Sequence, residues 1–88
     1  MAVIHPSIFQ VIRRFPKHRE EILHLYHSSE LFRTTCYDYK KCKKALLYWS
    51  SLSSDESSAR RAEYGELLHS IETEIINYLS EGGLPREA

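Results

Sequence analysis

The clearest pattern in the sequence is a helical repeat of apolar residues in its second half. Between residues 30 and 52 the repeat falls at Phe32, Cys36, Tyr39, Cys42, Leu46 and Trp49. A second stripe, over residues 55–80, falls at Tyr64, Leu68, Ile71, Ile75 and Tyr78. Spacings of three and four are the periodicity of one face of an α-helix. Two such helices joined by a short polar turn predict an antiparallel helical hairpin, with Leu46, Trp49, Leu68 and Ile71 buried along its seam.

Serines and glycines mark the ends of these two helices. Ser53 and Glu56 fit a capping box, which predicts that the last helix begins at about residue 55. Gly82 and Gly83 predict its end, because glycine enters the left-handed helix cap without steric cost. At residues 28–29 two serines favour a break before the hairpin. A continuous helix is the alternative, since serine interrupts a helix only mildly.

Two shorter helices are predicted before the hairpin, over residues 7–15 and 17–28. Ser7 and Gln10 fit a capping box for the first of them. Pro16 ends that helix, and its missing amide is tolerated in the first turn of the next. We therefore expect an all-α fold of three or four helices in a single domain, residues 1–88, with the short helices packed across the hairpin.

Length and composition indicate where in the cell this domain is located. The chain has 88 residues, and its apolar runs are far shorter than the roughly 20 residues of a membrane span. The run before Pro6 is also too short for a signal peptide. Two cysteines do not make a disulfide framework, and reduced thiols are typical of the cytoplasm. We expect a cytoplasmic protein with no membrane association.

The charge is neutral overall but unevenly distributed. Residues 1–50 carry nine Lys/Arg against four Asp/Glu, a net charge of +5, and residues 51–88 carry three against eight, a net charge of −5. This division predicts basic and acidic helices that lie side by side and flank each other's seams. The neutral total argues against nucleic acid as a partner.

The cysteines and histidines are the residues with the chemistry to bind a ligand. Cys36 and Cys42 are six residues apart, which separates them by about 120° on a helix and does not match zinc-site spacing. Both fall on the apolar stripe, so we expect core cysteines. His24 and His27 lie three apart on a helix and alone make a weak metal site. We predict no catalytic, cofactor or metal site. The alternative is a ligand- or metal-binding bundle that uses these histidines or the cysteine stripe.

A polar face of the long third helix is the candidate interaction face. Tyr37, Lys41, Lys44 and Tyr48 recur at spacings of four, three and four, opposite the apolar stripe. A Tyr/Lys face binds phosphate or stacks a base in some proteins. It equally suits packing of the N-terminal helices, or contact with another protein, where tyrosine is enriched.

Two blocks of the sequence resemble a family of small, uncharacterised bacterial helical proteins. The first is residues 32–42, Phe-Arg-Thr-Thr-Cys-Tyr-Asp-Tyr-Lys-Lys-Cys, followed by Ala45, Leu46 and Trp49. The second is residues 63–68, Glu-Tyr-Gly-Glu-Leu-Leu. The resemblance spans residues 18–80 and implies a short, cytoplasmic, helical bacterial protein, without implying an activity.

The function that these observations favour is a small protein-interaction or regulatory module without catalytic activity of its own. A one-domain helical hairpin lacks the concave cleft that catalysis usually needs. Its apolar residues lie on more than one side of each helix, and two short helices can cover only part of them. We therefore expect a protein partner, with a homodimer as the simplest form.

Overall fold

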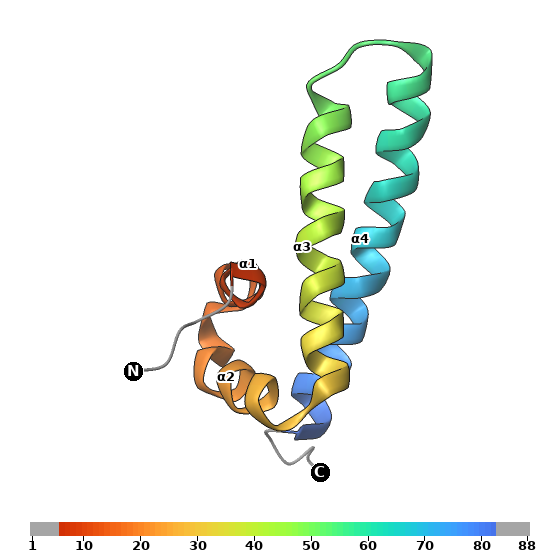
Figure 1. Ribbon diagram of the computed structural model, residues 1–88. Coiled ribbons are helices and arrows are strands. Elements are labelled where there is room, and N and C mark those ends of the chain that lie inside the picture. Colours follow the sequence, from red (N-terminus) through yellow and green to blue (C-terminus); the bar gives the residue numbers. More distant parts are fainter. Residues whose placement is uncertain (1–5, 83–88) are drawn as a thin grey trace.

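The computed structural model describes residues 6–82, with side chains placed through residue 79. Within this range the chain is helical and contains no strand, which confirms the all-α prediction. The elements are α1 (Pro6–Arg14), the 3₁₀ helix η1 (Pro16–His18), α2 (Arg19–Ser28), α3 (Glu30–Ser50) and α4 (Asp55–Gly82). Figure 1 shows α3 and α4 side by side as an antiparallel hairpin, with α1 and α2 against the end far from the connecting turn.

The predicted helix bounds need small corrections. The first helix begins at Pro6 rather than at residue 7, so Ser7 lies inside the first turn instead of preceding it, and the helix ends at residue 14 rather than 15. The second does not begin at residue 17, because Pro16 opens a 3₁₀ turn that redirects the chain before α2. The hairpin helices, predicted at 30–52 and 55–80, span residues 30–50 and 55–82.

The predicted break between α2 and α3 is confirmed at Ser29. Its backbone is extended, with φ −132° and ψ 115°, and its Oγ accepts a hydrogen bond from the Phe32 amide at 3.1 Å. Arg33 on α3 reaches back across the break to the end of α2, where its Nη1 donates to the carbonyl oxygens of Tyr26, at 2.7 Å, and His27, at 3.3 Å. Side chains of the break and of α3 thus satisfy backbone groups that both helix ends leave unpaired.

The turn at the tip of the hairpin carries a capping box one residue later than predicted. Helix α4 begins at Asp55, so the cap is Ser54 and its reciprocal partner is Ser57, rather than Ser53 and Glu56. The Ser57 amide donates to Ser54 Oγ at 3.1 Å, and the Ser54 amide donates to Ser57 Oγ at 2.9 Å. Ser57 is fully buried.

Arg61 closes the same turn from one helical turn further along α4. Its Nη1 donates to the carbonyl oxygens of Trp49, at 3.3 Å, and Leu52, at 3.2 Å. These carbonyls belong to the end of α3 and the start of the turn, where backbone acceptors lack helical partners. The tip is therefore held by side-chain hydrogen bonds from α4.

The apolar core lies at the base of the hairpin, where α1 and α2 pack against α3 and α4. Its buried members come from all four α-helices: Ile8, Val11, Ile22, Phe32, Cys36, Tyr39, Cys42, Ile71, Ile75 and Leu79. The ring of Phe32 packs edge-on against that of Tyr78, with centroids 5.1 Å apart. All four α-helices therefore contribute side chains to one core.

The outer half of the hairpin, residues 43–70, contains only one buried residue, Ser57. The prediction of a buried seam holds for Ile71 but is wrong for Leu46, Trp49 and Leu68, which are half-buried. The cause is architectural, because α1 and α2 end below this level and two helices alone cannot enclose the side chains between them (Figure 1).

A polar network joins three helices inside the base. Glu72 Oε2 on α4 accepts hydrogen bonds from Tyr39 Oη on α3 and from Arg14 Nε on α1, both at 3.0 Å. Tyr39 is fully buried, so its hydroxyl depends on this carboxylate for a partner. Burial, together with the hydrogen bond and charge of Glu72, raises the pKa of Tyr39.

Candidate interaction surface

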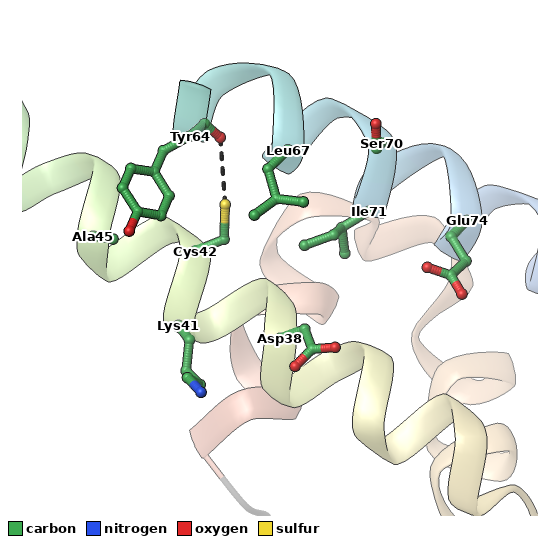
Figure 2. A pocket seen from close by; sticks show the side chains of 9 residues that line it. All are labelled: Asp38, Lys41, Cys42, Ala45, Tyr64, Leu67, Ser70, Ile71 and Glu74. Atoms are coloured by element: carbon green, nitrogen blue, oxygen red, sulfur yellow. Dashed lines mark hydrogen bonds between the residues drawn. The ribbon is translucent and has the colours of Figure 1, made fainter. Parts of the chain in front are cut away.

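A groove runs between α3 and α4 on the side of the hairpin turned away from α1. Its volume is about 520 Å³. Figure 2 shows the residues that line it: Asp38, Lys41, Cys42 and Ala45 from α3, and Tyr64, Leu67, Ser70, Ile71 and Glu74 from α4. These residues repeat at helical spacing on both helices, so the groove is a property of how the two helices pair.

The floor of the groove is apolar and its sides are polar. Ile71 and Cys42 are buried at the bottom, where Cys42 Sγ donates a hydrogen bond to the Tyr64 carbonyl at 3.3 Å. Leu67 is 48% exposed although it points between the helices (Figure 2). A leucine in this position has its apolar surface available to a second molecule.

The predicted face of Tyr37, Lys41, Lys44 and Tyr48 borders this groove. All four side chains are exposed, so the N-terminal helices do not cover them. Lys41 belongs to both surfaces, because it lines the groove and its Nζ lies 5.2 Å from the centre of the Tyr37 ring. Tyr48 packs edge-on against Trp49, with ring centroids 5.0 Å apart. We call the groove and this face together the hairpin surface.

The interaction face predicted from the sequence contains no residue of α4. Leu67 falls off the centre of the α4 heptad stripe, and this displacement was the available signal. Whether Leu67 is covered or exposed depends on which side of the hairpin α1 occupies, and sequence spacing does not specify that side. With α1 on the opposite side, Leu67, Ser70 and Glu74 are left facing the groove.

The two sides of the hairpin surface carry opposite charges. On the α3 side, Lys41 and Lys44 are exposed beside a single carboxylate, that of Asp38. On the α4 side, Glu74 lines the groove and Glu66, one turn before Ser70, borders it. Both are exposed, and neither carboxylate forms an ion pair with any side chain in residues 6–79. The division between basic and acidic halves seen in the sequence therefore appears as a basic α3 edge beside an acidic α4 edge.

Both cysteines lie in the core. Burial raises the pKa of the Cys36 thiol from its ordinary 9.0 to about 12, and it also raises the pKa of Cys42. A thiol with a raised pKa is a poor nucleophile and a poor metal ligand near neutral pH, because the thiolate is the reactive form. The positions of Cys36 and Cys42 are those of packing residues.

The histidines named in the alternative interpretation are not brought together with other ligands. His24 and His27 are exposed on α2. Across the described residues, no group of three or more His, Cys, Asp or Glu side chains is placed to hold one metal ion. The cysteine stripe and the two histidines therefore remain separate features of the fold.

Comparison with known proteins adds no family to this description. No family model matches the chain, and no curated protein or solved structure matches it either. The resemblance of residues 32–49 and 63–68 to small bacterial helical proteins stays a prediction. Within residues 6–82, every helix is too short or too polar to cross a bilayer.

Proposed function

We propose that this protein is a small protein-interaction or regulatory module that binds another protein chain through the hairpin surface and has no catalytic activity of its own. The observation that carries the proposal is the outer half of the hairpin. Tyr48 and Leu67 of the hairpin surface are 58% and 48% exposed there, and no helix within residues 6–82 covers them. Clusters of exposed aromatic and apolar residues rimmed by charge are typical of protein contact sites.

The chemistry of the groove supports binding rather than catalysis. Besides the Tyr64 phenol and the buried Cys42 thiol, its polar side chains are two carboxylates, one ammonium and the Ser70 hydroxyl, all four exposed on an open surface. Acid–base catalysis usually takes place in a site that encloses the reacting groups and excludes water. A cytoplasmic location and a bacterial origin are part of the proposal, and the sequence resemblance supports them.

Affinity capture from cells of the encoding organism tests this function. The test variant is Leu67→Glu, which places a charge in the groove, and the matched control is Leu47→Glu. Leu47 is also exposed on the outer half but lies about 200° around α3 from Ala45. Circular dichroism checks that both variants fold.

We expect a protein that wild type and Leu47→Glu retain and that Leu67→Glu loses, or a self-association with the same dependence. If wild type is a monomer and captures nothing that depends on Leu67, the proposed function is wrong.

A further inference from the structure

We infer that the hairpin surface binds a second copy of the chain, with the two-fold axis parallel to the hairpin, so that α3 of each copy lies against α4 of the other. The inference rests on the proposed interaction function and names its partner and geometry. It predicts a four-helix arrangement at the interface, in which the uncovered sides of the two hairpins cover each other.

Charge selects this geometry. A two-fold axis parallel to the helices places the basic α3 edge of one copy against the acidic α4 edge of the other, twice per dimer. An axis perpendicular to the helices instead places α3 against α3 and α4 against α4. That arrangement brings Glu66 toward Glu74 of the second copy and Lys41 toward Lys41 of the second copy, so like charges repel on both helices. Its favourable contact, Asp38 with Lys44, does not relieve the Lys41 pair, which the parallel axis avoids.

Lys44 on α3 and Glu66 on α4 lie at the same height, which here means position along the hairpin axis from base to tip. Tyr39 pairs with Glu72 near the base, and Arg61 contacts the Trp49 carbonyl near the tip. Lys44 lies midway between Tyr39 and Trp49, and Glu66 lies midway between Arg61 and Glu72. A parallel two-fold axis leaves height unchanged, so it sets Lys44 opposite Glu66 of the second copy.

The neighbouring lysine fits the same register. Lys41 is nearly one helical turn closer to the base than Lys44. At that height the facing α4 presents Ser70, with Glu66 and Glu74 one turn to either side. In the dimer, the ammonium groups of Lys41 and Lys44 on each α3 therefore face Glu66, Ser70 and Glu74 on α4 of the other copy.

The apolar content and size of the surface suit a dimer. Leu67, Ile71 and Tyr64 of one copy face Ala45 and the groove of the other. Helix α3 has 21 residues and is about 31 Å long, and two adjacent helices are roughly 20 Å wide. A face of these dimensions is in the range of the roughly 800 Å² that a standard interface buries on each partner.

One contact in this geometry is unfavourable and therefore informative. Asp38 lies near the height of Glu74, so the parallel axis brings it close to Glu74 of the second copy. Neutralising Asp38 removes a repulsion in this arrangement. With the perpendicular axis through the groove centre, Asp38 faces Lys44 of the second copy, and neutralising it removes an attraction.

Sedimentation equilibrium of the full chain, over a wide concentration range, tests the inference with two charge reversals. Lys44→Glu and Glu66→Lys each create two like-charge contacts, so each alone is expected to weaken the dimer about 10-fold or more. An equimolar mixture of the two variants restores both opposite-charge pairs, so it is expected to form a heterodimer near wild-type strength. Lys17→Glu and Glu20→Lys, on exposed positions of η1 and α2, make the same changes in net charge as controls.

Three results overturn the inference. They are a wild-type chain that stays monomeric, single variants that dimerise like their controls, and a Glu66→Lys variant that dimerises more tightly than wild type. Asp38→Asn is expected to tighten the dimer, and a weaker dimer assigns the perpendicular axis instead. A monomeric wild type that still captures a Leu67-dependent protein overturns the self-pairing and leaves the proposed function standing.

Discussion

The base and the outer half of the hairpin are built from the same two helices and differ in what covers them. At the base, α1 and α2 complete an enclosure in which Ile75, Phe32 and Tyr39 are fully buried. In the outer half, side chains at equivalent stripe positions, such as Leu46 and Leu68, remain half-buried. Helical periodicity therefore specifies which residues face a neighbouring helix, and the number of neighbouring helices decides whether they are buried.

The largest expected effect is the loss of unfolding free energy when an apolar side chain is truncated, which should be greater at the base than in the outer half of the hairpin. Ile75→Ala at the base is expected to lower the free energy of unfolding by about 2–5 kcal/mol, through lost transfer energy and a residual cavity. Leu68→Ala in the outer half is expected to cost clearly less, and the exposed Leu47→Ala about 0.5 kcal/mol or less. Urea denaturation of the three variants measures the series. Equal costs for Ile75→Ala and Leu68→Ala, measured at concentrations where the chain is monomeric, would contradict the comparison.

Alkaline pH is expected to destabilise the base selectively. Cys36 has a pKa of about 12 when folded and an ordinary value of 9.0, so the folded state holds its proton more tightly. Its stabilising effect is complete below about pH 9 and falls as pH rises toward 12, by roughly 1.4 kcal/mol per pH unit. Tyr39 and Cys42 act in the same direction.

Urea denaturation between pH 8 and 11 measures this loss, and Cys36→Ala is the control. The variant is expected to lose less stability than wild type over that range. An identical pH dependence in both proteins would show that the buried thiol does not contribute.

The polar network tests how much one partly buried hydrogen bond contributes to the base. Tyr39→Phe removes the hydroxyl that donates to Glu72 and leaves the ring in place. Since Glu72 keeps its contact with Arg14, we expect a loss of about 1–2 kcal/mol, at the low end of what a hydrogen bond to a charged group contributes. Thermal denaturation of Tyr39→Phe beside Tyr48→Phe, an exposed tyrosine without a hydrogen-bonding role for its hydroxyl in the described residues, measures the difference. Equal melting temperatures would mean that the network adds no stability.

The smallest effect concerns helix propensity in the outer half. Gly65 lies within α4, and a Cβ added there meets no atom within 4 Å beyond its chain neighbours and the nearby backbone of the helix. Gly65→Ala is therefore expected to stabilise the chain by up to about 1 kcal/mol, because alanine loses less backbone entropy than glycine on forming a helix. Ala62→Gly, at an exposed position one turn earlier, is expected to destabilise by a similar amount. A destabilising Gly65→Ala in a monomeric sample would show that the backbone at this position is approached by another part of the chain.

Local signals in the sequence predicted most of the fold, and long-range packing explains the remainder. The stripes containing Cys36 and Ile75 identified both hairpin helices, and the serines at 28–29 located the break, because helix periodicity and capping depend on near neighbours. The half-burial of Trp49 was not predictable in this way. It depends on where α1 ends in space, which no spacing within α3 encodes.

The candidate site shows the same division. The face of Tyr37, Lys41, Lys44 and Tyr48 was identified from spacing along one helix, and the structure places it beside an exposed groove. The α4 side, with Leu67 and Glu74, needed the pairing of two helices and the placement of α1 on the opposite side. Sites formed within one helix are thus more accessible to sequence analysis than sites formed between two.

The Arg61 contacts at the tip have a consequence for binding kinetics and entropy. A hairpin with a loose turn would sample several relative positions of α3 and α4, and a partner would have to order them on contact. Hydrogen bonds from Arg61 to the Trp49 and Leu52 carbonyls, together with the Ser54–Ser57 box, fix the tip before any partner arrives. A preordered surface loses little conformational entropy on association, so a modest set of contacts in the groove yields more of its interaction energy as affinity.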